Sequence, residues 1–276
     1  MCYNLQAMVA KLLKRHRRWI ELALGFGVLV WLGWHILERE VVAEPGLLID
    51  KFRVTVFSTD IGVFSTDIGP EKHKPAEIVH KWNGPVRLGL HGNAARYRDL
   101  VESIAGEHTR LTGLSVSVVD LEGPEPPNFH VHLAEPGEVY NLLIRYGENP
   151  EMASELAKRA RCMAPTSHRE GLIFDSVAVI ENNFAEDLIR RCFIEEITHA
   201  LGLFAHSELV QPSFFSSRGL ILDELPLNDK ILVRTLYDPR ITPGMKREKV
   251  MEIAREIIPE LVRAVRERGV EALYQR

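Results

Sequence analysis

The side chains best suited to chemistry lie in one short stretch, CFIEEITHALGLFAH at 192–206. Glu195 and His199 are four residues apart, so on a helix they lie on the same face. Glu196 is one step round the helix, among apolar neighbours. Burying two carboxylates and an imidazole there costs desolvation energy unless a cation, an arginine or solvent compensates.

The spacing predicts a metal site related to H-E-x-x-H, in which two helical ligands flank a glutamate that acts as general base. Glu195 takes the first ligand position and can bind zinc through oxygen, Glu196 takes the base position, and His199 is the second ligand. Gly202 permits a left-handed exit from the helix, which would bring His206 to the same ion. These residues predict zinc-dependent peptide hydrolysis with Glu196 as the catalytic base.

The longer metzincin pattern agrees with this prediction in part. Its glycine falls at Gly202, whereas its third histidine would fall at Ala205, one residue before His206. Metzincins also have a methionine-containing turn beneath the metal, and Met245 is the candidate for it. The missing first histidine keeps a second interpretation open: a non-catalytic binding or structural module without metal chemistry.

The two interpretations predict different geometries. Convergence of Glu195, His199 and His206 within about 4 Å of a common point favours a cation. A His206 that points away, or an Arg190 or Arg191 side chain folded over Glu195, favours the non-catalytic module.

The helix that positions these residues is expected at 184–201, with Asn183 and Glu186 as a capping box. Alternating and periodic residues predict the elements around it. The strands are expected at 86–90, 114–119, 129–133 and 172–180, and the other helices at 93–111, 151–161, 227–237 and 248–268. The pattern predicts one α+β domain at 85–276, with a zincin-like fold in which a small mixed sheet packs against the helix at 184–201 and a helical C-terminal part follows.

The amino terminus predicts a membrane anchor. Residues 1–18 form a cytoplasmic basic leader with five Lys or Arg and no acidic residue. As a helix, residues 19–37 are long and apolar enough to cross a bilayer. The positive-inside rule then puts the N-terminus in the cytoplasm and the domain on the outer side of the membrane. A signal peptide cleaved after Ala43 is the alternative.

Residues 38–84 are expected to be a linker and lead-in to the domain. They contain a duplication, VFSTDIG at 56–62 and again at 63–69. A hairpin or a slipped duplication in an exposed segment explains it, because seven residues repeated once are too few for a solenoid.

Cysteine usage and composition narrow the class of protein. Cys162 and Cys192 could pair in an exported domain, or they are two separate buried thiols.

The chain is 46% hydrophobic and 26% charged with a net charge of −4, which is typical of a globular protein and argues against a nucleic-acid binder. The partners expected are a protein or peptide of the envelope and, through residues 19–37, the membrane.

Three runs together resemble a known family. E-E-I-T-H-A-L-G-L begins at Glu195, P-S-F-F occupies 212–215, and L-Y-D-P-R-I-T-P-G-M occupies 236–245. In combination they are similar to the bacterial family of unknown function DUF2927, whose members are often envelope proteins, over roughly 85–255. The resemblance implies Gln at the place of His199 and an acid at the place of His206, so the two histidines here favour metal binding.

Overall fold

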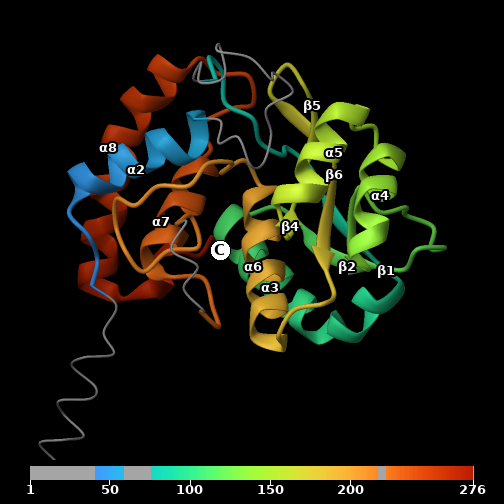
Figure 1. Ribbon diagram of the computed structural model, residues 1–276. Helices are drawn as coiled ribbons and strands as arrows, with labels where there is room; N and C mark the ends of the chain where they lie inside the picture. Colours follow the sequence, from blue (N-terminus) through green and yellow to red (C-terminus); the bar gives the residue numbers. More distant parts are fainter. Residues whose placement is uncertain (1–40, 59–75, 217–221, 276) are drawn as a thin grey trace, which may run out of the picture. The chain divides into compact units, whose positions relative to one another are not determined.

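Among the described residues, a six-stranded mixed sheet organises the domain (Figure 1). The computed structural model describes residues 41–58, 76–216 and 222–275, and one compact unit begins at Val42. The strands are β1 (Val86–His91), β2 (Val116–Val119), β3 (Phe129–Ala134), β4 (Cys162–Met163), β5 (Thr166–Arg169) and β6 (Leu172–Glu181). Their order is β2-β1-β3-β6-β4, with β5 also paired to β6. The neighbouring strands β2, β1, β3 and β6 pair in parallel. β4 and β5 run antiparallel to β6. The predicted mixed sheet is confirmed.

Helices cover both faces of this sheet (Figure 1). α4 (Val139–Arg145) and α5 (Pro150–Arg159) pack on one face and share a small hydrophobic core with Val177 and Val179 of β6. α3 (Arg98–Thr112) and α6 (Glu186–His199) lie on the other face. Side chains alternate along a strand, so Ala178 and Ile180 point into the main core instead.

A helical part extends the main core beyond the sheet. It consists of α2 (Pro45–Phe57), α7 (Leu227–Leu236) and α8 (Arg247–Arg268). Short 3-10 helices are η1 (Gly92–Tyr97), η2 (Pro136–Glu138) and η3 (Val270–Leu273). α8 continues through Pro259 as one helix.

Most predicted elements match the structure within a few residues, but the capping box is wrong and several short elements, among them α4, β4 and β5, were not predicted. The N-cap of α6 is Ala185, which makes no side-chain capping bond, so the predicted capping box does not form. α4 was not predicted, because a helix of seven residues is too short for its periodicity to stand out.

The linker predicted at 38–84 needs a larger correction, because α2 lies inside it. Leu48, Phe52, Val56 and Phe57 are buried in the main core, so this helix belongs to the domain. Val56 and Phe57 begin the first copy of the duplication, and the remaining duplicated residues from 59 onward lie outside the described residues.

No helix within the described residues is long and apolar enough to span a bilayer. Residues 1–18 and 19–37, predicted as basic leader and anchor, lie outside these residues.

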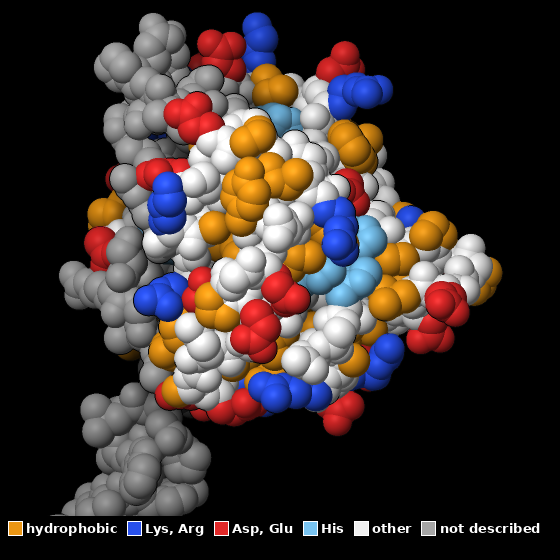
Figure 2. Space-filling view, turned by 45° about the vertical axis from the view of Figure 1, so that its right-hand side comes forward, with side chains coloured by type: hydrophobic (Ala, Val, Ile, Leu, Met, Phe, Trp, Pro, Cys, Tyr) orange, Lys and Arg blue, Asp and Glu red, His pale blue; other side chains and the backbone are white. Residues whose placement is uncertain are grey.

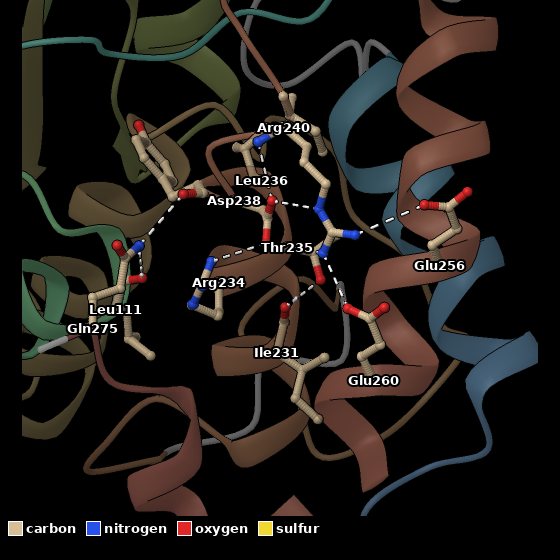
Figure 3. Close-up of polar contacts among 12 residues, drawn as sticks. Leu111, Ile231, Arg234, Thr235, Leu236, Asp238, Arg240, Glu256, Glu260 and Gln275 are labelled. Atoms are coloured by element: carbon tan, nitrogen blue, oxygen red, sulfur yellow. Dashed lines mark hydrogen bonds and ion pairs between the residues drawn. The ribbon is translucent and has the colours of Figure 1, made fainter. Parts of the chain in front are cut away.

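The run at 236–245 builds a charged network between α7 and α8 (Figure 3). Asp238 accepts a hydrogen bond from Arg240 Nε at 2.9 Å, and its other oxygen lies 3.6 Å from Nη1 of Arg234. Arg240 also lies 3.1 Å from Glu260 and 3.8 Å from Glu256 on α8. These contacts hold the turn after α7 against α8.

Candidate metal centre

α6 carries most of the predicted site. Glu186 and Asp187 in its first turn suit the positive end of the helix dipole. Ile189 and Phe193 anchor it in the main core. Glu195 and His199 therefore project from a helix whose orientation is fixed by packing.

The C-terminus of α6 is held by two hydrogen bonds and by a close backbone approach at Gly202. Trp82 Nε1 donates to the carbonyl of Ala200 at 2.9 Å, and the Tyr237 hydroxyl donates to that of Leu201 at 2.8 Å. Gly202 has φ 113°, and a Cβ there would lie 2.2 Å from the His80 carbonyl oxygen. The predicted positive-φ exit is confirmed, and only glycine fits it without displacing the backbone.

The segment after Gly202 is held by α2. The backbone N–H of Ala205 donates to the Thr55 carbonyl at 3.0 Å. The fully buried Lys51 donates from Nζ to the Val210 carbonyl at 2.9 Å and lies 3.8 Å from Asp229. Sequence analysis missed these positioning residues, because nothing in the pattern of α2 marks Lys51 as buried.

This framework brings the three predicted ligands together. Glu195 Oε1 lies 3.2 Å from His206 Nε2 and 3.9 Å from His199 Nε2. One donor atom from each residue lies within 4.8 Å of the others. Glu195 and His199 are buried, whereas the His206 side chain is 22% exposed, so solvent reaches the cluster from the His206 side.

A backbone contact sets the tautomer of His199. Its Nδ1 donates to the carbonyl of Leu203, which leaves Nε2 as the nitrogen directed toward Glu195. The ring also packs edge-on against Phe215, with centroids 5.2 Å apart. Metal-binding histidines commonly donate their second ring N–H to a carbonyl in this way, which fixes the ring and raises its basicity.

Arg191 neutralises part of the charge at the same place. Its Nη1 lies 2.8 Å from Glu195 Oε2, one turn along α6, and both side chains are largely buried. The structure therefore meets both geometric conditions stated for the sequence: the three ligands converge, and an arginine covers Glu195. The two conditions are compatible because Arg191 contacts Oε2 of Glu195, whereas both histidines face its Oε1.

Glu196 is the predicted base and is buried beside Glu195. Burial and the neighbouring Glu195 carboxylate raise the pKa of Glu196 well above its ordinary value, while His206 and Arg191 oppose this rise. Among the described residues no hydrogen-bond partner reaches its Oε2 atom. A carboxyl of raised proton affinity suits a group that accepts and returns a proton near neutral pH.

Cys162 and Cys192 form a disulfide, with Cα atoms 5.9 Å apart. The bond ties β4 to α6 one turn before Glu195. Cys162 also lies within 4.8 Å of Glu195 and Glu196, but a disulfide sulfur is no thiolate and does not make that group a ligand set.

Met245 lies in a turn whose hydrogen bonds run to the segment before β1. Its carbonyl accepts from Val79 N–H at 2.9 Å, and Gly244 N–H donates to the Val79 carbonyl at 3.0 Å. A position beneath a metal stays a prediction. Tyr237 is a core residue whose hydroxyl serves the α6 terminus.

Comparisons with known proteins locate the chain in one family. No curated protein matches the sequence. A search of solved structures finds the crystal structure of myroilysin at 15% identity, covering 78% of this chain and 74% of that one, with a TM-score of 0.29, which is too low to establish a shared fold. The family model "Protein of unknown function (DUF2927)" matches residues 50–256, from within α2 to α8. The chain therefore belongs to the DUF2927 family, as its three sequence runs predict.

Proposed function

We propose that this protein binds a divalent cation through Glu195, His199 and His206 and acts as a zincin-like metallopeptidase. The convergence of these three side chains carries the proposal. Two nitrogens and one oxygen form a donor set that suits zinc and leaves a fourth position open, as catalytic zinc sites require.

The distances between the donors fit such an ion. Zinc bonds to nitrogen and oxygen are about 2.1 Å long, so two donors around a tetrahedral ion lie about 3.4 Å apart. Separations of 3.2 and 3.9 Å between Glu195 Oε1 and the histidine Nε2 atoms are close to that value. The contact from His199 to Leu203 and the pairing of Arg191 with Glu195 would act as the supporting shell.

Each residue then has a separate task in peptide hydrolysis. Bound zinc supplies a Lewis acid for a carbonyl and lowers the pKa of water. Glu196 accepts a proton at its carboxylate and returns it to the leaving amine. Its buried position next to Glu195 raises the pKa of Glu196, the direction that favours a group which takes up a proton.

We also propose that the domain works in the bacterial envelope on a protein or peptide. The apolar run at 19–37 after a basic leader supports a single-pass inner-membrane anchor with the N-terminus in the cytoplasm. The disulfide between Cys162 and Cys192 supports a periplasmic domain, because such bonds persist in oxidising compartments.

Metal analysis of the full-length protein tests the central claim. After refolding without metal and reloading with zinc, wild type is expected to hold one equivalent, and His199→Ala to bind at least tenfold more weakly. His168→Ala, which removes an exposed imidazole on β5, is the matched control and keeps the wild-type content. Equal zinc in wild type and His199→Ala contradicts the proposal.

Peptide hydrolysis is tested separately, on zinc-loaded protein. Glu196→Gln is expected to keep the metal and to lose at least a hundredfold in kcat, because general acid–base catalysis contributes about 10²–10⁴-fold. A Glu196→Gln protein as active as wild type excludes Glu196 as the base.

The ion pair between Arg191 and Glu195 favours a second candidate, a non-catalytic envelope module. In that case Arg191, together with His206 at 3.2 Å, compensates the buried carboxylate without a metal ion. Arg191→Met then removes the permanent positive charge beside the buried Glu195, and the free energy of unfolding should fall by about 3 kcal/mol. Arg190→Met, at an exposed neighbour, is the control and should change it by less than about 0.5 kcal/mol.

Zinc distinguishes the candidates in the same denaturation experiment. If the cluster binds metal, zinc at a hundred times its Kd restores about 2.7 kcal/mol to Arg191→Met. If zinc has no effect on the unfolding midpoint of wild type or variant, the non-catalytic module is the correct interpretation.

A further inference from the structure

A second polar site lies at the carboxyl edge of the parallel strands. It is a crevice of about 520 Å³ between the residues that follow β1 and those at the end of β3 and along α4. Its polar lining consists of His91, Asn93, His132, Glu138, Asn141 and Arg145. Histidine side chains gather at the surface on the side of the molecule that carries these elements (Figure 2).

The crevice lies where the topology of the sheet reverses. β1 pairs with β2 on one side and with β3 on the other, all in parallel. The chain after β1 enters α3 on the main-core face, whereas the chain after β3 enters α4 on the opposite face. The connections therefore diverge between the carboxyl ends of these two strands. In open parallel sheets such a point is where small ligands bind.

Arg145 gives the crevice a positive charge. It is exposed at the end of α4 and forms no ion pair with any described residue. Glu138 is engaged elsewhere, since it accepts a hydrogen bond from Glu135 N–H at 3.2 Å in the capping box of η2. The guanidinium is thus the one positive group of the lining, beside the negative charge that Glu138 keeps.

Imidazoles form the wall next to it. His91 and His132 are register partners on β1 and β3, with stacked rings 4.2 Å apart. His91 Nε2 lies 2.9 Å from His130 Nδ1, and the Tyr146 hydroxyl lies 2.9 Å from His132 Nε2. Burial, the other two imidazoles and Arg145 lower the pKa of His132 to about 3, and burial also lowers that of His91, so both rings are neutral at pH 7. Neutral rings held by such contacts can donate from their second nitrogen.

We propose that this crevice binds a small anionic molecule, one that carries a carboxylate or a phosphate, with Arg145 as its charge partner and His91 and His132 as its hydrogen-bond partners. The guanidinium matches the planar or forked oxygens of both groups. Asn93 and Asn141 add neutral polar contacts for the remainder of the ligand. None of its lining residues belongs to the metal centre.

Calorimetric titration of the metal-free full-length protein with inorganic phosphate and with succinate, at constant ionic strength, tests the proposal. One of the two is expected to bind saturably with one molecule per chain. Arg145→Gln should weaken that binding at least tenfold, and His91→Gln should weaken it several-fold. Arg263→Gln removes an exposed arginine on α8 and should leave it unchanged.

The preferred anion identifies the ligand class, phosphate for a phosphate ester and succinate for a carboxylic acid. Absence of saturable binding of either anion overturns the proposal, as does equal affinity in wild type and Arg145→Gln when both melt at the same temperature. His199→Ala should bind the anion as wild type does, and Arg145→Gln should keep its zinc, so failure at one site is distinguishable from failure at the other.

Discussion

At the scale of single residues, Gly202 links the end of α6 to the segment that carries His206. Its φ of 113° is strained for any side chain, and a Cβ would meet the His80 carbonyl at 2.2 Å. Gly202→Ala should therefore lower the free energy of unfolding by about 3 kcal/mol or more, from backbone strain together with the displaced contact. Urea denaturation measures the loss.

Gly106 provides the matched control for this substitution. It is exposed within α3, and nothing lies within 4 Å of its added Cβ. Gly106→Ala should stabilise the protein by about 0.5–1 kcal/mol, because alanine is the better helix former. If both variants lose the same stability, the argument from the close approach at His80 is wrong.

The sequence predicted those parts of the candidate centre that depend on local spacing. Glu195 and His199 share a helix face by their separation of four, and Arg191 precedes Glu195 by the same interval. The position of His206 could be inferred only from the helix exit at Gly202. The contacts that hold the segment around His206 come from Thr55 and Lys51, about 150 residues earlier. Side-chain pairing over that distance leaves no periodic signal.

At the scale of elements, the packing of α3 on α6 contains a pH-sensitive contact. His108 is buried and lies 3.0 Å from the Thr198 hydroxyl. Burial lowers its pKa to about 4, with Glu107 opposing and Lys230 adding to the shift. Below pH 6.5 His108 binds a proton in the unfolded chain but stays neutral in the folded protein. The free energy of unfolding therefore falls as pH falls from about 6.5 toward 4.

A comparison of His108→Gln with wild type isolates this effect. Between pH 7.5 and pH 5, wild type should lose about 2 kcal/mol more free energy of unfolding than the variant does. Urea denaturation at the two pH values measures both losses. Parallel losses in the two proteins would mean that His108 titrates alike in the folded and unfolded states.

Elements were predicted best where they are long and their environment is simple. α8 shows its helical period directly in the sequence, and β6 stands out as a ten-residue run rich in β-branched residues. α2 was missed because its burial depends on α7 and α8, which lie almost two hundred residues later. The sequence likewise did not show which face of the sheet α3 covers and which face α4 covers, since a strand buried on both faces has no clean alternation.

At the scale of the whole molecule, α2 decides where the domain begins. A chain that starts at Pro85, the boundary expected from sequence, lacks Leu48, Phe52, Val56 and Phe57 in its core. At about 2 kcal/mol for each buried side chain the loss approaches the entire stability of a typical domain. Such a chain should show no cooperative thermal transition, whereas one starting at Val42 should unfold cooperatively.

The carbonyl of Phe57 accepts a hydrogen bond from the backbone N–H of Ala76 at 2.7 Å. The duplicated heptapeptide begins with Val56 and Phe57 at the end of α2 and continues outside the described residues. Gain or loss of one copy by replication slippage would leave the sequence on both sides of the repeat unchanged, with Val56 and Phe57 still at the end of α2. The gene can therefore lengthen or shorten here by seven codons without altering the residues that α2 buries.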